Sequence, residues 1–309
     1  MRKLKRFELG IAFAVALECV IFAFFTPQFL TPANAINVAL QTSITAIMAI
    51  GMTLVILTGG IDLSAGSLVA VAGVSAAFVV KAAGPAAALG VGLAAGAVSG
   101  LFTGVMVTRF TVPPFIVTLA LMSALRGAAF LMTGGYSVGD LPEGFAMLGR
   151  GYLAGLPVPV LVTALLYAVF TVLLARTVFG RHIYAVGGNE RAAYLAGVST
   201  ARIKVGVYIL NGLLGGFAGV MLASRLGAGI PNAGLGYELD VIAAVVVGGA
   251  SLFGGKGTLG GTLLGAIFIG ILNNGLNLAN VDPYLQKIVL GGVVLAAVLL
   301  DQRLARSNA

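Results

Sequence analysis

Long apolar runs separated by short polar segments dominate this sequence. A membrane-spanning helix needs about 20 mostly apolar residues, and ten runs approach or reach that length. They lie near residues 9–25, 38–57, 67–80, 86–107, 115–133, 158–175, 205–223, 240–250, 259–279 and 285–300. The pattern therefore predicts about ten transmembrane helices. The third and eighth runs are too short for an upright helix, so we expect broken or re-entrant segments there, covered by protein or facing a cavity.

The composition favours a membrane protein and excludes other classes. Of the 309 residues, 59% are hydrophobic and 9% are charged, whereas roughly a quarter of a soluble domain is charged. Disorder is excluded because so much apolar surface cannot stay in water. A disulfide scaffold is excluded because Cys19 is the only cysteine. We expect an all-α, polytopic integral membrane protein with one transmembrane domain over residues 1–309.

The basic residues predict the orientation of the chain. The net charge is +8, which in a soluble protein suggests nucleic acid as a partner. With the N-terminus inside, however, 13 of the 18 basic residues fall in cytoplasmic segments, as the positive-inside rule requires. We therefore predict two cytoplasmic termini, a lipid bilayer as the surroundings and no nucleic-acid partner.

The N-terminus has some features of a signal peptide, namely a basic start and an apolar run. Glu18 interrupts that run, and Ala33-Asn34-Ala35 ends ten residues beyond Phe25, too far for a usual cleavage site. We expect an uncleaved first helix.

No enzyme site emerges from the residues. The single histidine, His182, has no cysteine or carboxylate cluster beside it, so no metal-ligand set can be assembled. The stretch 250–257 approaches a phosphate-binding loop, but Ala250 stands where the first glycine belongs and Gly257 replaces the Ser or Thr that holds magnesium. A nucleophile elbow is also absent. We expect no catalytic residue, no metal and no cofactor bound by this chain, which leaves transport or membrane scaffolding.

The longest segment predicted to be cytoplasmic, residues 176–204, contains signals for a short helix. Asn189 is a good N-cap, Glu190 suits the first turn, and Gly197 can end the helix in a left-handed conformation. The signals predict a helix of about two turns. It is either a connecting loop whose arginines enforce topology or a docking element for a soluble partner.

A glycine pattern occurs twice. Residues 59–66 and 248–255 share G-G-x-x-L-x-x-G, each between two apolar runs and each predicted on the cytoplasmic side. Helices broken in corresponding places indicate a transport pathway, although glycines also permit close packing alone. Asp62 in the first copy is costly at a span end unless it caps a helix or faces water. Asp62 or Ser64 capping the third helix is the structural alternative.

Polar side chains within the spans suggest a path for a neutral polyol. Their alternative role is to hold the bundle together through interhelical hydrogen bonds. Glu18 and Arg126 are the charges expected at membrane depth, where they pair, face a cavity or lie near an interface. The candidate pathway residues are Gln41, Asp62, Ser64, Asn211, Asn273, Asn274 and Asn277.

Several of these stretches, in the same order, resemble the permease subunits of bacterial ABC sugar importers, most of all the ribose type. The resemblance covers about residues 26–303. The segments that carry it are T-G-G-I-D-L-S at 58–64, G-R-H-I-Y-A-V-G-G-N-E-R-A-A at 180–193, G-Y-E-L-D-V-I-A-A-V-V-V-G-G at 236–249, G-G-K-G-T at 254–258 and L-N-N-G-L-N at 272–277.

The resemblance implies a monosaccharide substrate, a ribose-like pentose, and a set of partners. Family members pair as dimers in the bacterial inner membrane, are driven by two cytoplasmic ATPase subunits that hydrolyse the ATP, and receive sugar from a periplasmic binding protein. The loop helix is similar to their ATPase-coupling segment, with Arg191 inserted into the Glu-Ala-Ala…Gly pattern. The coupling residues implied are Gly188, Asn189, Glu190, Arg191, Ala192, Ala193 and Gly197.

Three alternatives stay open. A secondary transporter needs acid–base pairs for ion coupling, for which the candidates Glu18, Arg126, Glu238 and Asp240 are scattered. A permease of the same class can carry another sugar, a nucleoside or a branched-chain amino acid, and neutral pathway groups favour the first two. A scaffold without transport disagrees with the paired breaks. With 8% aromatic residues and no Trp, we expect weak sugar affinity, with recognition left to the binding protein.

Overall fold

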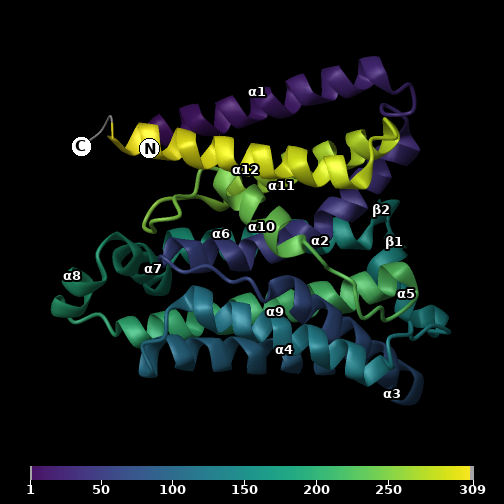
Figure 1. Cartoon of the computed structure of the whole chain (residues 1–309), viewed down its shortest axis with the longest axis horizontal. Helices are drawn as coiled ribbons and strands as arrows, with labels where there is room; N and C mark the ends of the chain where they lie inside the picture. The colour runs from purple at the N-terminus through teal and green to yellow at the C-terminus, as the bar shows by residue number, and fades with distance from the viewer. Residues whose placement is uncertain (1, 307–309) are drawn as a thin grey trace.

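A computed structural model describes the backbone of residues 2–306 and the side chains of residues 8–299. The basic side chains predicted at both chain ends therefore lie outside the described residues. The described chain is a bundle of helices (Figure 1). Its helices are α1 (Arg2–Phe25), α2 (Pro32–Leu57), α3 (Ala65–Arg109), α4 (Pro114–Thr133), α5 (Glu143–Arg150), α6 (Val158–Arg176), α7 (Val178–Gly188), α8 (Glu190–Leu195), α9 (Thr200–Leu226), α10 (Tyr237–Val247), α11 (Leu259–Leu278) and α12 (Pro283–Arg306).

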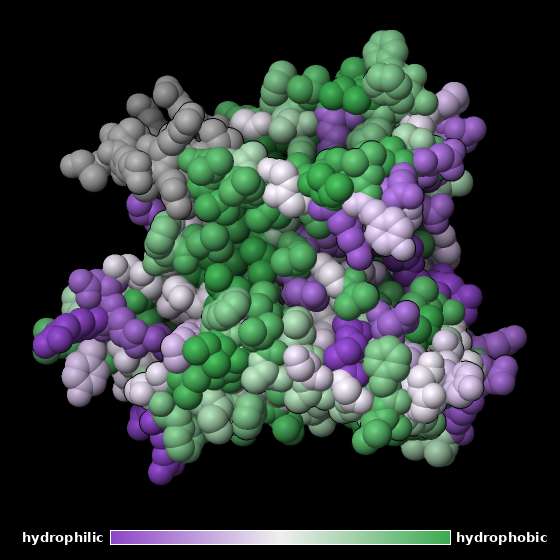
Figure 2. Space-filling model, in the orientation of Figure 1, coloured by the Kyte–Doolittle hydropathy of each residue, from purple (hydrophilic) through white to green (hydrophobic). Residues whose placement is uncertain are grey.

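The bundle has two distinct ends. At one end lie α7 and α8, together with the start of α1 and the end of α12 (Figure 1); we call it the loop end. At the other end lie α5 and a short antiparallel hairpin of β1 (Tyr152–Leu153) and β2 (Leu156–Pro157); we call it the hairpin end. Hydrophilic residues gather at both ends, while hydrophobic residues cover much of the middle (Figure 2). That distribution suits a protein that crosses a bilayer.

Seven of the described helices are long and apolar enough to cross a membrane. They are α1, α2, α3, α4, α6, α9 and α11. The predicted all-α, polytopic membrane fold is therefore confirmed. The count of ten spans and the cytoplasmic location of both termini stay predictions.

Helix α3 holds two of the predicted spans, the third and the fourth. Its 45 residues would extend about 67 Å as one straight helix, more than twice the hydrocarbon core of a bilayer. The helix breaks at Gly84, where φ is +79°, and Pro85 follows directly. Glycine tolerates this left-handed conformation, and proline cannot continue the preceding helix. The two predicted spans are therefore joined by a tight reversal.

The contacts with α9 show that α3 reverses its direction. Before the break, Leu68 packs at Gly215 and Gly73 packs at Ala223, so this half runs parallel to α9. After the break the order is inverted. Helix α9 is thus contacted by both halves of α3, one parallel to it and one antiparallel.

In the antiparallel half of α3, the backbone packs directly against the backbone of α9. A Cβ on Gly96 would collide with the carbonyl of Gly212, and one on Gly92 would collide with Val220. A Cβ on Gly100 would collide with the carbonyl of Tyr208. Small residues at every fourth position let membrane helices approach this closely. The glycine-rich composition is therefore used in part for helix packing.

The eighth predicted span, 240–250, is helical over residues 240–247 and irregular after them. Helix α10 covers Tyr237–Val247, and residues 227–236 before it form no helix. That irregular chain packs along α3, with Gly229 against Val74 and Gly234 against Gly66. Backbone without regular structure is tolerated at membrane depth where protein covers it, which agrees with the predicted broken segment.

Candidate functional site

Helix α8 at the loop end has the two caps that the sequence predicts. The side chain of Asn189 accepts a hydrogen bond from the backbone N–H of Ala192 at 2.9 Å. Gly197 follows the helix with φ at +85°, a conformation that favours glycine. The helix is shorter than the predicted range, since it ends at Leu195. Ala193 is its only buried residue, so α8 stands out from the bundle as a small, separately capped element.

Helix α7 precedes α8 and was not predicted. Thr177 caps it by accepting a hydrogen bond from Gly180 N at 3.1 Å, and it buries Ile183 and Val186 completely or nearly so. Tyr184 donates its hydroxyl to the carbonyl of Gly257 at 2.9 Å. Burial raises the pKa of Tyr184 above its ordinary value, so the hydroxyl stays a donor at neutral pH. Helix α7 therefore fixes the loop to the bundle.

The two glycine patterns lie side by side at the base of α7. We define the first break as residues 58–64, between α2 and α3, and the second break as residues 248–258, between α10 and α11. Gly255 N donates to Leu57 O at 2.9 Å. A Cβ on Gly187 of α7 would collide with that same carbonyl. The repeated pattern thus marks a junction of three segments that are far apart in sequence.

Aligning the two breaks by their backbone hydrogen bonds shifts them by one residue from the alignment that the sequence pattern gave. Gly59 N donates to Ile56 O and Gly60 N donates to Val55 O. The same pair of bonds occurs at Gly249 and Ala250. Gly59 therefore corresponds to Gly249, whereas the pattern aligned it with Gly248. The left-handed φ of Gly59 and Gly249, +79° and +86°, decides the alignment, because both end their helices in the same way.

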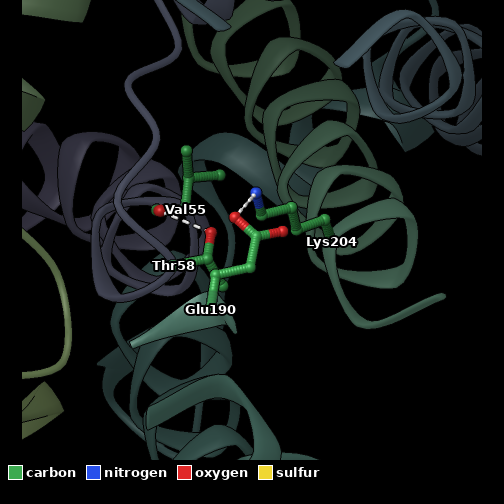
Figure 3. A network of polar contacts seen from close by, with 4 residues as sticks. All are labelled: Val55, Thr58, Glu190 and Lys204. Carbon is green, nitrogen blue, oxygen red and sulfur yellow. Dashed lines mark hydrogen bonds and ion pairs between the residues drawn. The ribbon is translucent and has the colours of Figure 1, made fainter. Parts of the chain in front are cut away.

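An ion pair joins α8 to α9 beside the first break. Lys204 Nζ lies 2.5 Å from Glu190 Oε2. Figure 3 shows this pair next to Thr58, whose hydroxyl donates to the carbonyl of Val55 at 2.8 Å. Thr58, Glu190 and Lys204 line a cleft of about 540 Å³ at the loop end. Its other lining residues include Thr108, Thr111 and Phe253. The cleft separates the loop helix from the α3–α4 connection.

Three predicted pathway residues form one buried cluster inside the bundle. Asp62 Oδ1 accepts hydrogen bonds from Ser64 N at 2.8 Å and from Ser64 Oγ at 2.6 Å. Asp62 Oδ2 accepts from Asn211 Nδ2 at 2.6 Å. All three side chains are at most 5% exposed. Ser64 is the N-cap of α3 but its side chain makes no capping bond, so the cluster does more than end a helix. We call Asp62, Ser64 and Asn211 the central cluster.

The structure places the other four predicted pathway residues elsewhere. Asn273 Nδ2 lies 3.5 Å from Asp240 Oδ2 of α10. Asn274 exchanges hydrogen bonds with Asn34 at the start of α2. Asn277, near the end of α11, accepts from Gln286 at 3.0 Å. Gln41 lies half-buried on α2. Interhelical bonding, the alternative weighed above, therefore describes Asn273, Asn274 and Asn277.

The charges expected at membrane depth do not pair with each other. Arg126 Nη1 donates to the carbonyls of Pro231 and Ala233, both at 2.9 Å, and so fastens the irregular chain before α10 to α4. Glu18 on α1 is 7% exposed, and its carboxyl oxygens have no hydrogen-bond partner among the described residues. Within the same part of the chain, no group of His, Cys, Asp or Glu side chains can hold a metal ion.

Broken helices, a buried polar cluster and a fastened loop helix are typical of the membrane-embedded component of a transport system. Comparison with known proteins identifies it further. The chain belongs to the permease family described as "Branched-chain amino acid transport system / permease component", which matches residues 34–298. No solved structure matches the chain.

Its curated relatives match over nearly their full length. It is 46% identical to a ribose import permease of Bacillus subtilis (strain 168), over 96% of this chain and 93% of the relative. It is 46% identical to that of Escherichia coli (strain K12), over 94% and 92%. An L-arabinose ABC transporter permease of Azospirillum brasilense is 40% identical, over 95% and 87%.

Proposed function

We propose that this chain is the permease subunit of a binding-protein-dependent ABC importer that carries a monosaccharide across the bacterial inner membrane. A ribose-like pentose is the proposed cargo, because the relatives above are permeases for ribose and L-arabinose. Each partner ATPase hydrolyses the ATP, and this chain supplies the path and binds no cofactor. A second copy of the chain completes the path, and a periplasmic binding protein delivers the sugar.

The observation that carries the proposal is the construction of the loop end. Tyr194 and Leu195 on α8 are 68% and 78% exposed, although the helix is capped and fixed. Exposed apolar side chains on a rigid, polar end of a protein are typical of a surface that meets a partner. Arg191 beside them is also exposed and gives the surface a positive rim. We assign this surface to the ATPase.

The contacts of the loop give it a route to the path. Helix α7 is tied to both breaks through Gly187 and Tyr184, and α8 is tied to α9 through Glu190. ATP-driven closure of the two ATPases moves the loops of both copies and tilts the helices, so that the path opens outward. The binding protein then releases its sugar, and hydrolysis resets the inward-facing state.

The composition of the interior supports a path with weak affinity. The hydrogen bonds of the central cluster run among its own three members, and few aromatic rings are present for stacking on a sugar. We therefore assign substrate recognition to the binding protein. Sugar binding to the isolated permease that is tighter than to the binding protein contradicts this assignment.

The experiment is ATP hydrolysis and sugar uptake by the chain in nanodiscs and proteoliposomes with its candidate ATPase. Sugar-loaded binding protein should stimulate hydrolysis in the wild type. Gly197→Pro should abolish stimulation, because proline cannot adopt φ near +85°. Tyr194→Ala should lower it about tenfold, as loss of a central interface residue does. Tyr136→Ala is the matched control, since Tyr136 is 80% exposed at the opposite end.

Two results contradict the proposal in different ways. If no ATPase associates and sugar equilibrates across vesicles without ATP, the chain is a secondary transporter. If stimulation occurs but leucine or a nucleoside is carried in preference to ribose and arabinose, the class is right and the cargo is wrong. Omission of ATP tests the first outcome, and competition among these four cargoes in the uptake assay tests the second.

A further inference from the structure

One face of α9 follows the first break residue by residue. Lys204, Tyr208 and Asn211 are four and then three positions apart, so they share a side of the helix. Lys204 lines the cleft with Thr58, and Figure 3 shows the two side chains on either side of Glu190. Asn211 donates to Asp62 at the far end of the break. The helix and the break therefore lie along each other from the loop end into the bundle.

Tyr208 occupies the middle of this contact and has an unused donor. The residue is 1% exposed, and its hydroxyl has no hydrogen-bond partner among the described residues. It lies directly over Gly60, since a Cβ there would be 2.5 Å from Tyr208 Oη. A buried hydroxyl without a partner is costly and asks for an explanation.

The nearest charged group offers that explanation. Tyr208 lies over Gly60, two residues before Asp62, and Asn211, which bonds to Asp62, follows Tyr208 by about one helical turn, so the hydroxyl and the carboxyl group are neighbours that make no hydrogen bond with each other. Asp62 accepts three hydrogen bonds in this structure, and an ionised carboxylate has room for about four. One acceptor position is therefore left for a donor on α9.

The backbone of the first break has few features that would prevent it from shifting past the Tyr208 hydroxyl. Gly59 has a left-handed φ of +79°, and Gly60 has no side chain that would catch on the tyrosine. The break is non-helical over 58–64, so its backbone can slide without breaking a helix. Gly187 of the loop packs against Leu57 just before the break, and Asn211 of α9 bonds to Asp62 near its end, so movement of the loop relative to α9 changes where the break lies against Tyr208.

We propose that Tyr208 is a positioning residue whose hydroxyl bonds to Asp62 only in the other state of the transport cycle. In this structure the hydroxyl makes no hydrogen bond to any described residue. When the loop moves, the first break shifts along α9, and the new bond stabilises the shifted arrangement. This inference rests on the proposed function, because it needs a cycle with two states.

The first test compares Tyr208→Phe with a control that loses a bond in the present state. Tyr167 is also buried and donates to Ala46 O at 3.1 Å. Because an unpartnered buried hydroxyl is costly, Tyr208→Phe should leave the melting temperature of the nucleotide-free protein unchanged or raise it by a few degrees. It should lower ATP-driven pentose uptake about tenfold, the effect of one lost bond to a charged group. Tyr167→Phe should show the reverse pattern, a lower melting temperature and near-normal uptake per folded molecule.

Uptake by Tyr208→Phe at the wild-type rate overturns the inference. So does a melting temperature that falls as far as in Tyr167→Phe, because the hydroxyl would then be bonded in the resting state. If wild-type uptake proves independent of ATP, the proposed function fails. The ratio of the uptake rate of Tyr208→Phe to that of wild type still tests the role of Tyr208.

A structure of the nucleotide-bound complex is the direct measurement. Tyr208 Oη should lie within hydrogen-bond distance of the Asp62 carboxylate, about 2.5–3.0 Å. A hydroxyl that is still unpartnered in that state, or one bonded to an ordered water in both states, overturns the inference.

The position of the break against the tyrosine has its own test. Gly60→Ala should impair folding because its Cβ meets Tyr208 Oη, and Tyr208→Phe in the same chain should restore part of the folded yield. Absence of any restoration contradicts the placement of Gly60 on which the inference depends.

Discussion

Asn34 and Asn274 form a reciprocal pair of amides across the bundle. Asn34 Nδ2 donates to Asn274 Oδ1 at 3.0 Å, and Asn274 Nδ2 donates to Asn34 Oδ1 at 2.9 Å. The two residues are 240 positions apart in the chain. The pair therefore joins the start of α2 to α11, close to where α1 leads into α2.

Removing one member of this pair should cost stability. Asn274→Ala leaves the Asn34 amide short of a partner, and we expect a loss of about 1 kcal/mol, the scale of such bonds between membrane helices. Thermal unfolding in detergent measures it. Asn277→Ala is the control, because its partner Gln286 is shared with the carbonyl of Val281 and the contact is exposed. Equal losses in both variants contradict the prediction.

The backbone contact of α3 with α9 should tolerate no side chain. Gly96→Val forces the two helices apart at the Gly212 carbonyl, and we expect a loss of about 3 kcal/mol or more. The amount of folded protein recovered from membranes reports it. Gly90→Val provides the comparison, since a Cβ there meets nothing within 4 Å. Normal yield of the Gly96 variant is the outcome that refutes this packing.

Asp62 should be more tolerant of asparagine than of alanine. In Asp62→Asn, the new amide oxygen can still accept from Ser64, and Asn211 can rotate its amide to accept from the new NH2 group. Asp62→Ala leaves the donors of Ser64 and Asn211 buried without an acceptor, for about 1–3 kcal/mol. Unfolding of both variants should therefore rank alanine as the worse. Equal losses in the two variants would mean that the carboxylate charge itself is the stabilising feature, and the opposite order would contradict the prediction.

Reversing the ion pair at the loop should be correctable. Glu190→Lys places two cations together at the cleft and should lower coupled transport, and so should Lys204→Glu. The double variant restores opposite charges and should recover most of the activity. Stability should change by less than about 1 kcal/mol, because the Glu190 side chain is 49% exposed. Uptake and melting temperature of the three variants check both statements.

The predicted orientation can be read from cysteine labelling. In a Cys19→Ser background, Tyr194→Cys should react with an impermeant thiol reagent only when the cytoplasmic face is accessible. Tyr152→Cys, which replaces a residue 51% exposed in the hairpin, should react only from the opposite face. Labelling of both from one side would overturn the topology, including the two cytoplasmic termini.

The seven spans that the structure describes were predictable because lipid requires every crossing segment to be long and apolar. Apolar length is visible in a single sequence, and so are the caps of α8, since Asn189 and Gly197 act on their immediate neighbours. Helix α7 escaped prediction because its glycines and basic residues resemble a loop, and its order comes from burying Ile183 against distant segments.

The candidate site was less predictable, because its contacts also join segments that are far apart in the sequence. Asp62, Ser64 and Asn211 were chosen as polar residues in apolar surroundings, and the structure brings them together. Nothing in the spacing of Asn274 or Asn277 shows that their partners are Asn34 and Gln286. Tyr208 gave no signal at all, because its importance comes from lying over Gly60, a glycine far earlier in the chain.

The reversal in α3 has a consequence for how the protein is made. The glycine surfaces of α3 are synthesised well before α9, their partner, with 90 residues between Arg109 and Thr200. At ordinary translation rates that interval lasts about 5–20 s. During it, the nascent chain presents a helical hairpin whose exposed backbone has only lipid or the insertion machinery to contact. Membrane insertion of this permease therefore includes a waiting period for α3, which ends only when α9 emerges from the ribosome.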